Sequence, residues 1–183
     1  EAVAPANPQE IVFVYGGRYV VDYSLSSLKR FDVVYMAGLI YRSGDDLSRI
    51  STLLKSYVDS GGGLILDTGV LQYGGGMTGI PEPFPVNRTY TSNLNLVLNA
   101  WKIHPIVEDV DLDAFNTKEN RSVSYAVEVG KGVEIIVADY DRPIIVLGGS
   151  RGKVVWTGLN IPYLAVLNMD RWNMSSAASR LLV

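Results

Sequence analysis

The sequence predicts an α/β fold in which a parallel sheet comes first and antiparallel strands follow. Continuous apolar runs at 11–15 and 32–36 each end near glycine, as buried strands of a parallel sheet do. An amphipathic helix over 45–60 separates the second run from a third at 64–67, which completes a strand–helix–strand unit. Beyond residue 122, glycines divide the apolar runs at short intervals, which is typical of hairpins.

The first elements follow from local signals. Residues 1–10 carry Pro5 and Pro8 and are expected to form a linker. We expect residues 11–183 to form one domain, cut from a larger protein. A short helix is predicted over 24–31, behind a serine cap. The helix over 45–60 begins with two aspartates, has apolar residues three and four apart, and ends at a run of glycines.

The later elements alternate between irregular and extended segments. Residues 73–86 are rich in glycine and proline, so they are predicted to form a long surface loop. The segment 91–101 fits a helix or a strand equally well. A final helix is predicted from residue 163 onward. Strands are predicted at 122–129, 132–140, 142–149 and 152–158.

Composition excludes several function classes. Of the 183 residues, 48% are hydrophobic and 19% charged, which indicates a folded domain. A net charge of −3 disfavours nucleic-acid binding. No apolar run is long enough to span a bilayer, so membrane contact is expected only through segments outside this sequence. The chain has no cysteine and one histidine, so we expect no disulfide, thiol nucleophile, metal site or cofactor.

Three stretches resemble the class I glutamine amidotransferase-like superfamily: FDVVYMAGLIYRSGDDLSRISTLLKSYVDSGGGLILDTG (31–69), IHPIVEDV (103–110) and RPIIVLGGSRGKVVWTGLNIPY (142–163). They also resemble trehalose-utilisation-like proteins and the middle domain of family 42 β-galactosidases, where the domain serves assembly. The resemblance implies a flavodoxin-like three-layer sandwich with a mostly parallel sheet and a C-terminal antiparallel hairpin extension. Glutaminases of the superfamily need a cysteine nucleophile, which this chain lacks, so their activity is excluded.

The carboxyl ends of the predicted parallel strands are the favoured place for a ligand. Arg18, Tyr41 and Asp67 follow the first three strands, where a guanidinium would hold an anion and a tyrosine would stack on a sugar. The resemblance adds His104, because the HPI segment approaches this edge in related proteins. The alternatives stay open: the glycines before Arg18 form an ordinary turn, and His104 is a packed, hydrogen-bonded residue.

Two acidic motifs have competing interpretations. Asp67-Thr68-Gly69 matches the active-site signature of dimeric aspartic proteases, which share one proton between two carboxylates. However, Asp67 follows a helix-to-strand connection, which is not the β-barrel setting of those enzymes. The acidic residues within 108–113 lack the spacing of an EF-hand and are interpreted as a solvated surface.

Asn87 and Asn120 begin glycosylation sequons in predicted loops. They favour an extracytoplasmic or cell-surface domain of a bacterium or archaeon, although the absence of cysteine also suits a cytoplasmic protein. The 11 tyrosines are typical of surfaces that contact carbohydrate or protein.

The sequence therefore supports one leading function and two alternatives. The leading hypothesis is a non-catalytic interaction or assembly module within a larger, membrane-anchored or surface-exposed prokaryotic protein. Its partner would be another protein or another domain of the same chain. The first alternative is a carbohydrate-related enzyme or sugar-binding domain that uses the carboxyl edge of the sheet. The second is a dimeric aspartic protease that acts through Asp67.

Overall fold

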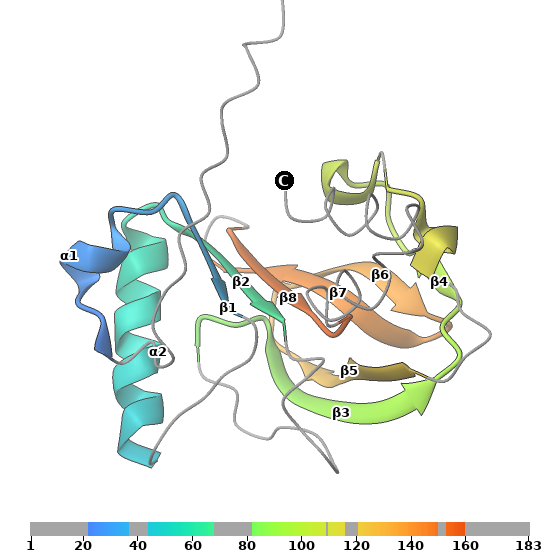
Figure 1. Ribbon diagram of the computed structural model, residues 1–183, viewed down its shortest axis with the longest axis horizontal. Helices are drawn as coiled ribbons and strands as arrows, with labels where there is room; N and C mark the ends of the chain where they lie inside the picture. The colour runs from blue at the N-terminus through green and yellow to red at the C-terminus, as the bar shows by residue number, and fades with distance from the viewer. Residues whose placement is uncertain are drawn as a thin grey trace, which may run out of the picture.

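The computed structural model describes residues 22–36, 44–67, 82–108, 110–115, 121–149 and 153–159 (Figure 1). The predicted linker over 1–10, the first predicted strand at 11–15 and the final predicted helix lie outside the described residues.

The main sheet has six strands in the order β1-β2-β8-β7-β6-β4. The first three strands in this order are parallel, and each later strand is antiparallel to its neighbour. The predicted parallel pairing of the second and third apolar runs is confirmed, because β1 lies beside β2 in register. The described part of the sheet is nevertheless mixed. Its strands are β1 (Val33–Met36), β2 (Gly63–Asp67), β4 (Leu98–Ala100), β6 (Glu134–Asp139), β7 (Arg142–Gly148) and β8 (Val154–Thr157).

A second sheet of two long antiparallel strands, β3 (Val86–Leu94) and β5 (Arg121–Val129), lies beside the main one (Figure 1). The four strands predicted beyond residue 122 are therefore all confirmed. The predicted surface loop ends sooner than expected, because Val86 is fully buried and already belongs to β3. The ambiguous segment 91–101 is extended: it contains the end of β3 and all of β4.

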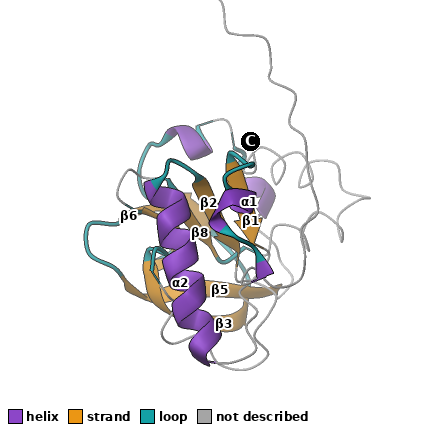
Figure 2. Ribbon diagram, turned by 90° about the vertical axis from the view of Figure 1, so that its left-hand side faces the viewer, coloured by secondary structure: helices purple, strands orange, loops and turns teal. Residues whose placement is uncertain are grey.

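Two helices pack on one side of the parallel strands (Figures 1 and 2). The first, α1 (Leu25–Leu28), is capped by Ser24, whose hydroxyl accepts the backbone N–H of Ser27 at 3.1 Å. It is shorter than the predicted helix, because the chain turns at residues 29 and 30. The second, α2 (Gly44–Asp59), confirms the predicted amphipathic helix within one residue at each end. No helix in the described ranges is long and apolar enough to cross a membrane.

The hydrophobic core has two parts. The first joins α2 to the parallel strands, and Trp156 of β8 is fully buried at its centre. The second lies around β6 and β7, where the chain also forms two short 3-10 turns, η2 (Pro105–Val107) and η3 (Leu112–Phe115). The buried residues of the second part are Leu96, Leu98, Val107, Val123, Ile136, Val137, Ile144, Ile145, Leu147 and Leu159.

Candidate functional site

Asp67 ends β2 at the carboxyl edge of the parallel strands, where the sequence predicts a ligand. Its side chain is buried, with the residue only 1% exposed. The hydroxyl of Tyr35, on neighbouring β1, donates a hydrogen bond to Asp67 Oδ2 at 2.9 Å. Alternate residues of a strand share a face, so Tyr35 and Asp67 lie on the face opposite Leu66, which packs toward α2.

The electrostatics of this pair favour a structural role. Burial raises the pKa of Tyr35 far above its ordinary value, and the charge of Asp67 and the hydrogen bond to it add to the effect. Tyr35 therefore stays protonated and acts as a donor at any pH near neutrality. A buried carboxylate that is held in this way ties β1 to β2 and presents little surface to a substrate.

Thr157 extends this polar cluster across the sheet. It ends β8, directly beside Asp67 in the parallel register, and is 2% exposed. Its hydroxyl accepts the backbone N–H of Leu159 at 3.2 Å. Sequence analysis identified Asp67 but missed Tyr35 and Thr157, because their proximity depends on the register of three strands. A polar residue near the end of each apolar run was the available signal.

His104 lies away from this cluster. It caps η2, where its Nδ1 accepts the backbone N–H of Ile106 at 3.2 Å, as the packed alternative predicts. Strands β8, β7 and β6 separate β2 from β4, which precedes His104. At about 4.8 Å per strand, β4 lies roughly 19 Å from β2 across the sheet, and no hydrogen bond or ion pair between Asp67 and His104 is seen among the described residues.

The other predicted site residues divide between described and undescribed segments. Arg18, Tyr41 and Asn120 lie outside the described residues. The prediction of a loop at Asn87 is wrong, because Asn87 is the second residue of β3, where it belongs to a two-stranded sheet and is exposed. Within the described ranges, no three histidine or acidic side chains are grouped to hold a metal ion, and this includes the described acidic residues of 108–113.

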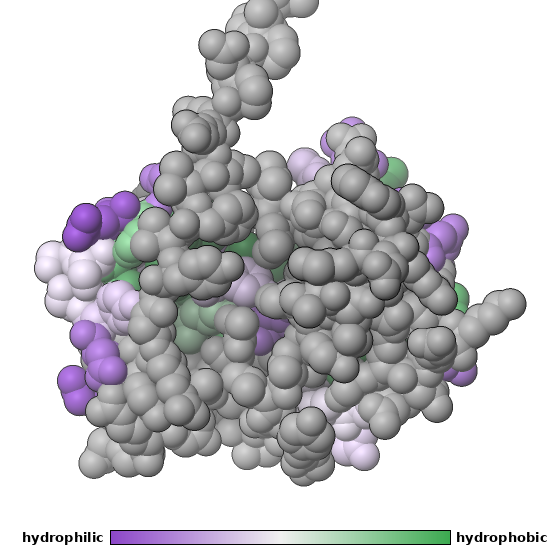
Figure 3. Space-filling view, in the orientation of Figure 1, coloured by the Kyte–Doolittle hydropathy of each residue, from purple (hydrophilic) through white to green (hydrophobic). Residues whose placement is uncertain are grey.

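A different surface stands out around β4. Trp101 is 55% exposed and Ile103 is 92% exposed, just after the strand ends. Val97, just before the strand, is 38% exposed, and Tyr140, in the turn that follows the paired strand β6, is 67% exposed. We call these four residues the β4 patch. Figure 3 shows hydrophobic surface at the side of the molecule where β4 lies in Figure 1.

Charged residues border the β4 patch. Lys102 lies between two of its members in sequence and forms an ion pair with Glu134 of β6. An apolar centre with a charged rim is the usual anatomy of a protein–protein interface. The sequence shows that these four residues are apolar, but their exposure depends on what the rest of the chain covers.

Comparison with known proteins gives a fold-level likeness. No family model matches the chain, and no curated protein matches it in sequence. The solved structure of the cytoplasmic protein STM1381 from Salmonella typhimurium LT2 aligns with 86% of this chain and 74% of its own, at 14% identity and a TM-score of 0.51. A putative ThuA-like protein from Bacteroides uniformis ATCC 8492 aligns with 91% and 80%, at 13% identity and a TM-score of 0.44. At these identities the first likeness concerns the fold alone, and the second carries no argument.

Proposed function

We propose that this chain is a non-catalytic interaction or assembly module with an amidotransferase-like, flavodoxin-like fold. The observation that carries the proposal is the exposure of the four apolar side chains of the β4 patch. Soluble monomers seldom leave large apolar residues clustered at the surface unless the cluster contacts something.

The chemistry of the patch suits a protein partner. Tryptophan and tyrosine are enriched among residues that dominate interface energies, because they bury a large area with little loss of conformational freedom. Burying one large apolar side chain stabilises a complex by about 1.5–3 kcal/mol. Burial of Trp101, Ile103 and Tyr140 would therefore supply about 4.5–9 kcal/mol, which offsets much of the cost of association, and further contacts at the rim would complete the interface.

The residues that would carry catalysis support the same proposal. The chain has no cysteine to form the acyl-enzyme of a glutaminase. An aspartic protease needs carboxylates that reach the substrate, whereas Asp67 is buried and holds the hydroxyl of Tyr35. Asp67 also ends a strand with parallel neighbours on both sides.

The cellular setting belongs to the proposal as well. We propose a larger prokaryotic parent protein, anchored in a membrane or exposed at the cell surface, with glycans at Asn87 and Asn120. The partner would be another protein or another domain of the parent chain.

A sugar-binding or carbohydrate-processing role at the carboxyl edge is the second candidate. It is favoured by the gathering of Tyr35, Asp67 and Thr157 where ligands bind in parallel sheets. This candidate requires the buried carboxylate of Asp67 to become accessible.

Site-specific photo-crosslinking tests the leading function. A benzophenone amino acid at position 103 should crosslink to one defined partner in extracts of the source cell, or to a defined domain of the parent protein. The same group at exposed Lys131, in the turn between β5 and β6, is the matched control. The partner must then bind the purified chain, and Trp101→Ala should weaken that binding at least tenfold. Equal crosslinking from both positions, or none from position 103, contradicts the proposal.

A further inference from the structure

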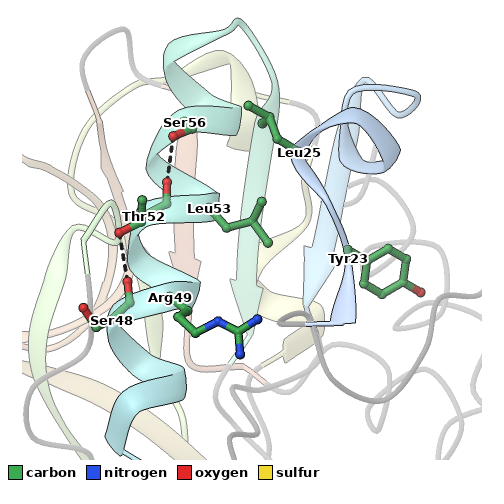
Figure 4. Close-up of a pocket in the computed structure, with 7 residues that line it drawn as sticks. All are labelled: Tyr23, Leu25, Ser48, Arg49, Thr52, Leu53 and Ser56. Carbon is green, nitrogen blue, oxygen red and sulfur yellow. Dashed lines mark hydrogen bonds between the residues drawn. The ribbon is translucent and has the colours of Figure 1, made fainter.

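A groove between α1 and α2 lies apart from the β4 patch and from the carboxyl edge. It is an open surface groove with a volume of about 430 Å³. Figure 4 shows Leu25 and Leu53 on its apolar side and Tyr23 across from the helix. The groove thus combines an apolar wall with the polar groups of α2, while the ring of Tyr23 points away from the helix (Figure 4).

Arg49 supplies the positive charge of this groove. Its exposed side chain extends from α2 toward Tyr23 (Figure 4). Within the part of the chain that the structure describes, its guanidinium has no hydrogen-bond or ion-pair partner. A guanidinium whose donors are all open favours a planar anion, above all a carboxylate, which it binds in a forked contact.

Two hydroxyls one helical turn apart supply acceptors. Thr52 donates its proton to the carbonyl oxygen of Ser48 at 3.0 Å, and Ser56 donates to that of Thr52 at 2.8 Å. Because both protons are used, the oxygen lone pairs are left to accept hydrogen bonds from a ligand. Along the helix axis, Thr52 lies about 4.5 Å beyond Arg49, and Ser56 lies about 6 Å further.

We propose that this groove binds a small polyhydroxy carboxylate, such as a sugar acid. The carboxylate meets Arg49, a hydroxyl proton of the ligand meets the oxygen of Thr52, and the C–H face of the ligand lies against Leu53. An α-amino acid fits less well, because its ammonium would sit beside the guanidinium and be repelled. A neutral sugar has no carboxylate for Arg49, and a simple carboxylate such as acetate has no hydroxyl groups to donate to Thr52, so both should bind more weakly.

Calorimetric titration with glucuronate tests this site. We expect saturable binding with a dissociation constant of about 1 mM. Glucose lacks the carboxylate, acetate lacks the hydroxyl groups, and alanine carries an ammonium. Each should therefore bind at least tenfold more weakly than glucuronate. Arg49→Gln should weaken glucuronate binding about tenfold or more, and Thr52→Val about threefold. Arg88→Gln, which changes an exposed arginine on β3, is the matched control and should leave binding unchanged.

Each contrary result overturns the proposal. These results are no saturable glucuronate binding, equal binding of glucose or acetate, or unchanged affinity in Arg49→Gln. Circular dichroism of the variants separates lost binding from lost folding. The groove shares no residue with the β4 patch, so failure here leaves the crosslinking test untouched, and the reverse also holds.

Discussion

The two halves of the molecule treat their apolar residues differently. In the parallel half, formed by β1, β2, β8 and α2, the large apolar side chains are directed into the core between helix and sheet. Val33 is the exposed exception among its described residues. The antiparallel half, formed by β4, β6, β7 and the β3–β5 sheet, has the other large apolar residues that are exposed in the described ranges: Tyr90, Val97, Trp101, Ile103, Val127 and Tyr140.

The two halves also differ in how the faces of their strands are covered. The helix covers one face of the parallel half, and the buried Tyr35–Asp67 pair closes part of the other. The antiparallel half has buried residues in both parts of the core, including Val86, Ala126 and Val146 in the first part, and it still leaves six large apolar side chains exposed. If the chain acts through contact, the contact surface belongs to the antiparallel half.

Gly158 lies where the two halves meet, and its replacement should have the largest effect. Its N–H donates to the carbonyl oxygen of Ile144 at 3.0 Å, and its own carbonyl oxygen accepts the N–H of Ser124 at 2.9 Å. A Cβ at this position would overlap the backbone carbonyl of Ser124. Gly158→Ala should lower the free energy of unfolding by about 3 kcal/mol or more, measured by urea denaturation.

Gly130→Ala is the matched control for this prediction. A Cβ at Gly130 would be 3.5 Å from its nearest neighbours, an ordinary contact distance. Gly130→Ala should therefore lower the free energy of unfolding by less than about 1 kcal/mol. If Gly158→Ala and Gly130→Ala lowered the free energy of unfolding equally, β5 and β8 would be free to separate.

Leu54 and Ile103 sharpen the comparison between core and surface. Leu54 is fully buried on α2 in the parallel half, so Leu54→Ala should cost about 3 kcal/mol of unfolding free energy. Ile103→Ala should change that free energy by less than about 0.5 kcal/mol, because the side chain is already in water. Chemical denaturation measures both, and a large cost at Ile103 would mean that the β4 patch holds the fold together.

Tyr35→Phe tests the buried polar pair. The change removes a donor to a buried carboxylate, so the free energy of unfolding should fall by about 1–2 kcal/mol at pH 7. Ser27→Ala removes the exposed hydroxyl that accepts the backbone N–H of Ser24 at 2.9 Å in the capping box of α1, and it should cost less than about 1 kcal/mol. If Tyr35→Phe lowered the free energy of unfolding less than Ser27→Ala does, the Tyr35–Asp67 pair would not have a structural role.

The stability that the Tyr35–Asp67 pair contributes should decrease at alkaline pH. The pKa of Tyr35 is raised above its unfolded value of 10.0, so the folded state holds this proton more tightly. The stability that it contributes is complete below about pH 10 and is lost as the pH rises further. In an ultraviolet titration, wild-type and Tyr35→Phe protein should therefore give the same tyrosinate signal until alkaline unfolding begins.

Local patterns predicted the parallel half well and the antiparallel half unevenly. The 3.6-residue period of α2 and the apolar run of β2 are signals within single segments. The local pattern of the segment 91–101 did not distinguish a helix from a strand, because Leu94, Val97 and Leu98 also have the spacing of a helix. Pairing of β4 with β6, far along the chain, makes it extended. The structure of this segment is therefore determined by its strand pairing, as is common for short apolar segments.

The candidate sites depended even more on tertiary structure. Asp67 was found because it directly follows an apolar run, whereas Tyr35 became its donor through cross-strand register. His104 was added to the site by resemblance; the described contact of its side chain is the capping hydrogen bond from Ile106, a partner that no local pattern predicted. Exposure of Trp101 and Ile103 has no local signature, because it depends on which segments fold over them.

Glu134, at the rim of the β4 patch, carries the smallest expected effect. The hydrogen bond from Lys102 lowers the pKa of Glu134; slight desolvation opposes this, and the electrostatic interaction with Lys102 and, least of all, with His104 adds to the lowering. A depressed folded-state pKa means that the pair stabilises the fold above the unfolded pKa, near 4.5, and that this contribution is lost as the pH falls through the folded value. Carbon-13 NMR titration should give a lower Glu134 pKa in wild-type protein than in Lys102→Met, and 1 M salt should narrow the gap. Because the pair is exposed, Lys102→Met should leave the urea midpoint nearly unchanged. A marked loss of stability would mean that the rim of the patch fastens β4 to β6, and that the antiparallel half depends on its surface as the parallel half does on its core.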